Sequence, residues 1–141
     1  MTGQPDEARQ IAHQLIAVRL HGDRVALTVQ ALLVARDGRR AGEVVGCLGD
    51  VIHRRTRTTA PHRTVDFEVP NFGLGLPLVA AATQYVNAIT NGQVLAQRAI
   101  IEDWESADLP ARQRLYLMAT VVFLLTAVAA NLLPARRGTT N

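Results

Sequence analysis

The feature that most constrains this chain is an uncharged segment at residues 115–133, LYLMATVVFLLTAVAANLL. A helix rises about 1.5 Å per residue, so this segment would roughly match the hydrocarbon thickness of a bilayer. Arg112 and Arg114 precede it, and Arg136 and Arg137 follow it, as anchors at a membrane interface would. The segment therefore predicts either a membrane span or a helix enclosed by protein.

The two long faces of this segment differ in side-chain size. One face carries a large apolar stripe: Leu117, Val121, Leu124, Val128 and Leu132. The other carries small and weakly polar residues: Ala119, Thr120, Thr126, Ala127, Ala130 and Asn131. Small residues allow another helix to approach closely, in a membrane or in a soluble bundle. We favour the buried helix, because the amphipathic segments before it need an apolar partner. The alternative is a tail-anchored membrane protein with a cytoplasmic N-terminal domain.

Two helices are predicted in the first part of the chain. The first covers about residues 5–20 and ends at His21-Gly22-Asp23, where Gly22 takes a left-handed conformation and Asp23 caps the next helix. The second ends at Asp37-Gly38. Its predicted core side consists of Val25, Ala26, Val29, Leu32 and Leu33.

A third helix is predicted over about residues 40–55, and it carries two different stripes. The core stripe consists of Val44, Val45, Leu48, Val51 and Ile52. The other consists of Gly42, Gly46 and Gly49. Glycine lowers helix stability, so a row of glycines indicates either close packing of another backbone or sequence drift.

The second part of the chain begins with an irregular segment. Residues 64–69 alternate polar and apolar side chains, which predicts a short strand or extended arm. Helices then follow at about 77–90 and 93–104, and Asp108 is the expected cap of the last helix. The expected fold is a single all-α domain of five to six helices. Its parts are a three-helix segment at 1–57, a linker at 58–76, a three-helix segment at 77–133 and a tail at 134–141.

Composition excludes several kinds of chemistry. All 15 cationic residues are arginine, and the chain has no lysine. The usual phosphate-binding loop and the usual Schiff base both require a lysine amine, so neither is possible here. Ser106 is the only serine, and no G-x-S-x-G elbow surrounds it. Cys47 is the only cysteine, and we expect it to be buried. The polar N-terminus predicts no secretory signal, which together with the single cysteine favours a cytoplasmic location.

An arginine-rich segment at residues 53–63 is the candidate nucleic-acid site. Its cations are Arg54, Arg55, Arg57 and Arg63. Arginine neutralises phosphates and contacts them with two hydrogen bonds at once. Against this interpretation, no aromatic residue lies between the arginines to stack on bases. A solvated loop paired with acidic neighbours is the simpler explanation.

The remaining polar residues form no strong catalytic or metal pattern. Glu102 and Glu105 are three residues apart and share a helix face, so they could act as an acid–base pair. Acidic residues around a tryptophan such as Trp104 are more typical of an exposed surface, and tryptophan is enriched at protein interfaces. The four histidines lack the close spacing of metal ligands, so we expect neither a metal nor a cofactor.

The function expected from these observations is a non-enzymatic protein–protein interaction module. We expect a protein partner, with self-association through residues 115–133. The expected interface consists of Leu117, Val121, Leu124, Val128, Leu132, Gly42, Gly46, Gly49 and Trp104. Nucleic-acid binding through residues 53–63 and membrane anchoring through residues 115–133 are the alternatives.

Overall fold

The computed structural model describes residues 3–56 and 72–132, and within them it contains helices and no strand. The predicted all-α bundle is therefore confirmed. Its helices are α1 (Gly3–Leu20), α2 (Arg24–Ala35), α3 (Gly38–Thr56), α4 (Leu76–Thr90), α5 (Val94–Ser106) and α6 (Ala111–Asn131). The predicted extended segment at 64–69 lies outside the described residues.

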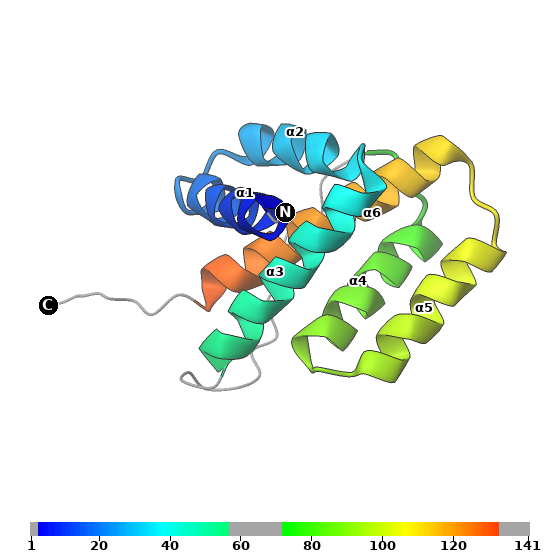
Figure 1. Ribbon diagram of the computed structural model, residues 1–141. Coiled ribbons are helices and arrows are strands. Elements are labelled where there is room, and N and C mark those ends of the chain that lie inside the picture. The colour runs from blue at the N-terminus through cyan, green and yellow to red at the C-terminus, as the bar shows by residue number, and fades with distance from the viewer. Residues whose placement is uncertain (1–2, 57–71, 133–141) are drawn as a thin grey trace, which may run out of the picture.

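Helix α6 forms the centre of the bundle. It packs against α1, α2, α3 and α4, whereas α5 packs only against α4 among the described helices. In Figure 1, α3 crosses in front of α6, with α1 and α2 on one side and the α4–α5 hairpin on the other. The apolar faces of four helices therefore share one central partner.

Every residue of α6 from 119 to 130 is buried. Both predicted stripes of this helix, the large and the small, therefore meet protein as far as residue 130, whereas Asn131 is exposed and Leu132 is half-buried. The buried hydroxyls of Thr120 and Thr126 donate to the carbonyl oxygens of Tyr116 and Val122, each at 2.8 Å, so neither hydroxyl is left unsatisfied. By length and composition alone, α6 still meets the criterion for a membrane span.

The predicted boundary between the first two helices is confirmed. Gly22 has a φ of +79°, a left-handed conformation that glycine adopts without steric cost. Asp23 caps α2, and its Oδ1 accepts a hydrogen bond from the backbone N–H of Ala26 at 3.0 Å. These two residues let the chain reverse within a few positions, which brings α1 and α2 together.

The predicted cap of the last helix is wrong. Pro110 occupies the N-cap position of α6 and makes no side-chain cap hydrogen bond. Asp108 instead has a φ of 53°, and its carboxylate lies 3.6 Å from the guanidinium of Arg114 in an exposed ion pair. Asp108 therefore shapes the turn between α5 and α6 rather than the first turn of the helix.

The predicted core side of α2 is wrong for three of its five residues, while Ala26 and Leu32 are half-buried. Val25, Val29 and Leu33 are 75%, 49% and 56% exposed. The buried residues are instead Leu27, Ala31, Val34 and Ala35. Helix α2 has apolar residues on most of its circumference, so periodicity alone does not select a face, and packing against α6 decides it.

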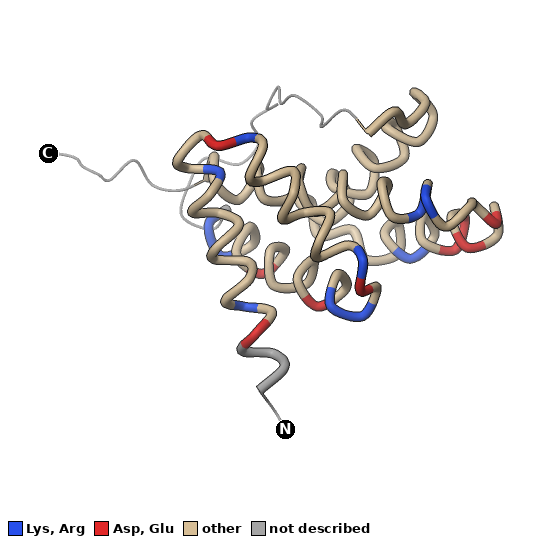
Figure 2. The backbone as a smooth tube through the Cα atoms, turned by 90° about the horizontal axis from the view of Figure 1, so that it is seen from above, with Lys and Arg blue, Asp and Glu red and all other residues tan. Residues whose placement is uncertain are grey.

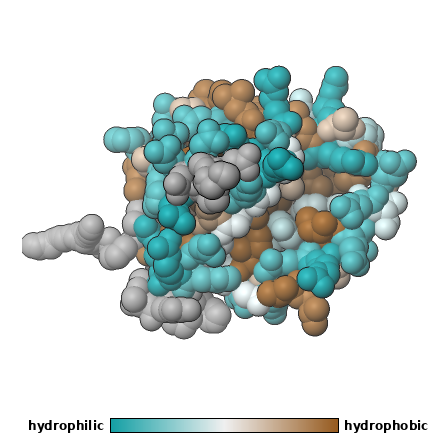
Figure 3. All heavy atoms as spheres, viewed as in Figure 1, coloured by the Kyte–Doolittle hydropathy of each residue, from teal (hydrophilic) through white to brown (hydrophobic). Residues whose placement is uncertain are grey.

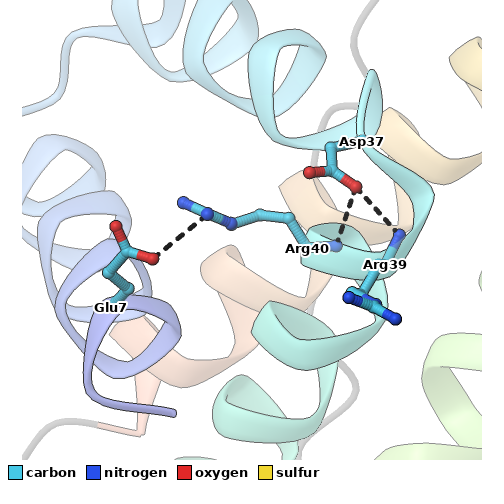
Figure 4. A network of polar contacts seen from close by, with 4 residues as sticks. All are labelled: Glu7, Asp37, Arg39 and Arg40. Carbon is cyan, nitrogen blue, oxygen red and sulfur yellow. Dashed lines mark hydrogen bonds and ion pairs between the residues drawn. The ribbon is translucent and has the colours of Figure 1, made fainter. Parts of the chain in front are cut away.

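The predicted core face of α3 is confirmed, since Val44, Val45, Leu48, Val51 and Ile52 are all buried. Polar contacts fix the start of this helix (Figure 4). Asp37 Oδ1 accepts from the backbone N–H groups of Arg39 and Arg40 at 3.1 and 3.3 Å. The Arg40 guanidinium donates to Glu7 at 3.1 Å and so links α3 to α1.

Candidate functional site

Two cavities lie one after the other between α3 and α5. The first, of about 310 Å³, is lined by Gly42, Gly46, Gly49, Tyr85, Ile89, Val94 and their neighbours. The second, of about 330 Å³, is lined by Gly38, Ile101, Trp104, Leu109, Leu117, Met118 and their neighbours. We call these two cavities together the α3–α5 groove.

The groove exists because α3 and α5 do not pack against each other. Helix α4 provides the floor of the first cavity, and α6 provides part of the floor of the second. From the second cavity to the first, the residue numbers of the lining rise along α3, from Gly38 to His53, and fall along α5, from Glu105 to Val94. The two helices that form the walls therefore run antiparallel. Figure 3 shows hydrophobic atoms on this face, between α3 and the α4–α5 hairpin.

The glycine row of α3 faces this groove. A Cβ atom added to Gly42 or Gly46 would have no atom within 4 Å outside its own helix, and both residues are exposed. Gly49 is buried, and a Cβ atom there would lie 3.2 Å from Ile89 Cγ2 of α4. The close approach of a second helix therefore occurs at Gly49, while Gly42 and Gly46 leave one wall of the groove open.

An aromatic pair lies between the two cavities. The rings of Tyr85 and Trp104 meet edge to face, with centroids 5.2 Å apart and an interplanar angle of 60°. Both side chains are half-buried, and burial raises the pKa of the Tyr85 hydroxyl. Sequence reasoning identified Trp104 but missed Tyr85, because a single tyrosine on an amphipathic helix has no pattern that distinguishes it.

Charged side chains mark the two ends of the groove. Asp50 and His53 line one end, and Glu105 and Arg114 line the other. His53 Nε2 lies 2.7 Å from the carbonyl oxygen of Ile89, to which it donates, so this side chain joins the end of α3 to the end of α4. Arg114 is paired with Asp108, which leaves Asp50 and Glu105 as the carboxylates at the two ends.

The interface predicted on the C-terminal helix is not accessible in this conformation. Leu117, Val121, Leu124 and Val128 are buried by the helices of the same chain, and Leu132 is half-buried. Self-association through residues 115–133 would require the bundle to open around α6. Self-association through this helix therefore stays a prediction. Three other residues of the predicted interface, Gly42, Gly46 and Trp104, lie at the groove.

The predicted nucleic-acid residues are only partly described. Arg54 is exposed, and its Nε donates to the carbonyl oxygen of Asp50 at 3.4 Å. Arg55 is half-buried, and burial followed by the charge of Arg54 lowers its pKa. Arg57 and Arg63 lie outside the described residues.

A polar cleft of about 580 Å³ lies between α1 and α3 and shares Asp50 and His53 with one end of the groove. It is lined by Arg9, His13, Cys47, Asp50, His53, Arg54 and two apolar neighbours. Cys47 is half-buried, not buried as we expected. Burial, then the Asp50 carboxylate, raises its pKa, so the thiol is held in its protonated form. This setting is the opposite of the one that activates a nucleophilic cysteine.

The other candidate polar residues do not converge on a site. Glu102 and Glu105 are both exposed on α5. No group of three histidine, cysteine or acidic side chains in residues 3–56 and 72–132 is placed to hold a metal ion. We therefore take the α3–α5 groove, whose lining is mainly apolar, as the candidate site in this part of the chain.

Comparisons with protein-family models, with curated proteins and with solved structures give no match to this chain.

Proposed function

We propose that this chain is a non-enzymatic helical interaction module that binds an amphipathic helix of a partner protein in the α3–α5 groove. The supporting observation is the open glycine wall at Gly42 and Gly46, opposite Val94 and Gln97 of α5. The apolar side chains of Ile101 and Trp104 continue the α5 wall in the second cavity. Glycine allows the backbone of a bound helix to approach closely, and apolar grooves between helices bind apolar helix faces in this way.

The chemistry of the partner follows from the lining. Apolar side chains spaced three and four residues apart would fill the two cavities, and a cation near each end of the helix would face Asp50 and Glu105. Helix α3 advances about 18 Å from Gly38 to Asp50, at about 1.5 Å per residue. A partner helix of three to four turns therefore matches the groove.

Fluorescence of Trp104 tests this function, because it is the only tryptophan of the chain and lines the groove. The probe is a synthetic alanine-rich helix of about 16 residues, with leucines spaced three and four apart and an arginine near each end. We expect a saturable change in Trp104 emission. The matched control is Gly46→Leu, which fills the groove without a backbone clash and should abolish the change. No change with the wild-type chain at millimolar peptide would refute the proposal.

The cleft between α1 and α3 supports a second candidate function, the binding of nucleic acid. The guanidinium of Arg9 and that of Arg54 line the same cleft, next to the start of the arginine-rich segment. Alanine at Arg9, Arg54, Arg55, Arg57 and Arg63 should then abolish binding that weakens as salt is added. If the wild-type chain binds neither DNA nor RNA at low salt, this function is rejected.

Membrane anchoring through α6 is the third candidate, supported by the length and apolar composition of that helix. The test is expression without detergent, followed by carbonate extraction. A carbonate-resistant membrane fraction would support anchoring and require α6 to leave the core. A chain found wholly in the soluble fraction would reject it and agree with a cytoplasmic location.

A further inference from the structure

An exposed apolar row on α2 is the feature that the groove does not use. It consists of Val25, Val29 and Leu33, spaced four residues apart, and we call it the α2 ridge. The opposite side of the helix, with Leu27, packs into the core. Figure 3 shows hydrophobic atoms at the top of the view, where α2 lies in Figure 1. The ridge is thus the outer face of a helix whose inner face is already occupied.

Charges bound the ridge at both ends. No charged residue lies between Arg24 and Arg36, and Asp23 and Asp37 lie just outside them. Figure 2, which looks down on α2, shows charged residues at both of its ends and none between them. Any partner of the ridge must therefore offer an apolar centre and matching charges at its ends.

A second copy of α2 has these properties in only one orientation. In a parallel pair, Arg36, which follows Leu33 by three residues and lies on the same side of the helix, would lie beside Arg36 of the second copy, which is repulsive. In an antiparallel pair centred on Val29, Val25 faces Leu33 of the second copy, and Arg36 lies beside Asp23 of the second copy. Twofold symmetry makes each of these contacts twice.

We propose that two copies of this chain associate through antiparallel packing of their α2 ridges. The contact uses none of the residues that line the α3–α5 groove, so it does not depend on the function proposed above. The ridge offers three large apolar side chains per copy, less than a standard interface of about 800 Å² per partner. The dimer is therefore expected to be weak.

Sedimentation of the full chain at rising concentration tests the association. The wild type should pass from monomer to dimer, and Val29→Glu should weaken the dimer at least about tenfold by placing two carboxylates face to face. Leu95→Glu is the matched control, because Leu95 is also an exposed apolar residue, at 78%, but lies on α5. It should leave the dimer unchanged. A wild-type chain that stays monomeric at millimolar concentration overturns the proposal, and so does equal weakening by both variants.

Cysteine cross-linking tests the orientation, in a Cys47→Ala background without other thiols. A mixture of the Val25→Cys and Leu33→Cys variants should form a mixed disulfide dimer under mild oxidation, faster than either variant alone. Rapid disulfide formation by Val25→Cys alone would show parallel packing and overturn the proposal.

A groove variant separates the two proposals. The Val29→Cys variant should cross-link to itself, and adding Gly46→Leu to it should leave this reaction unchanged. Loss of cross-linking on adding Gly46→Leu would show that the association depends on the groove, and that result overturns ridge-to-ridge packing.

Discussion

Alanine at Gly46 and at Gly49 should have opposite effects on stability, although both glycines lie inside the same helix. Alanine is favoured over glycine in a helix interior by about 0.8–1.0 kcal/mol. At Gly46 nothing outside α3 lies within 4 Å of the added Cβ, so the full gain is expected. Gly46→Ala should therefore raise the free energy of unfolding by about 1 kcal/mol, and the same reasoning applies to Gly42→Ala.

At Gly49 the added methyl group would meet Ile89 Cγ2 at 3.2 Å. Ile89 is buried, and its branched side chain has one strongly preferred rotamer in a helix, so it yields little space. Overpacking of this kind costs about 1–3 kcal/mol, which offsets or exceeds the gain in helix propensity. Gly49→Ala should therefore leave the free energy of unfolding unchanged or lower it by up to about 2 kcal/mol.

Urea denaturation followed by far-ultraviolet circular dichroism measures both variants against the wild type. The decisive quantity is the difference between them, about 1–3 kcal/mol in favour of Gly46→Ala. Equal stabilisation by both variants would show that α4 does not pack closely against Gly49. Destabilisation by Gly46→Ala would show that the wall of the groove is occupied, which would refute the assignment of this site.

Three further predictions test other parts of the structure. Asp23→Ala removes the cap of α2 and should lower the free energy of unfolding by about 1 kcal/mol. Asp23→Asn keeps a side-chain oxygen that can accept the cap hydrogen bond, so it should retain most of the wild-type stability. Thermal denaturation compares the two variants. Leu125→Ala should lower the free energy of unfolding by about 2–5 kcal/mol, because Leu125 is fully buried in α6. Urea denaturation measures this loss, and a smaller loss would show that α6 is not central to the core. Alkylation of Cys47 should be slower at neutral pH than alkylation of free cysteine, because the raised pKa of Cys47 leaves less thiolate. Asp50→Asn should increase the rate of alkylation. An unchanged rate in this variant would contradict the influence of the Asp50 carboxylate.

The helices themselves could be predicted from sequence because their signals are local. Gly22 and Asp23 end one helix and begin the next through their own backbone and side-chain geometry. The core face of α3 could be predicted because its apolar stripe is narrow and the rest of the helix is polar or glycine. Local chemistry of this kind acts within a few residues, so no knowledge of the fold is needed.

The candidate site could be predicted only in part. The glycine row and Trp104 were identified from sequence, but their meeting across a groove was not, because α3 and α5 are separated by about 40 positions in the chain. The groove exists because α3 and α5 do not contact each other, and the sequence of neither helix indicates whether they do. The same holds for the cleft between α1 and α3, where Arg9 and Arg54 come together only through packing.

Sequence by itself determined that residues 115–133 form an apolar helix and that the chain is all-α, and it left open whether this helix spans a membrane or is enclosed by protein. Tertiary structure decided how that helix is surrounded, with both of its stripes against protein. It also decided which side of α2 faces inward. Leu27 is buried while Val29 and Leu33 remain exposed, although all three are apolar. The physical reason is that burial of apolar surface is non-directional, so a helix that is apolar nearly all round acquires an inner and an outer face only from the shape of its neighbours.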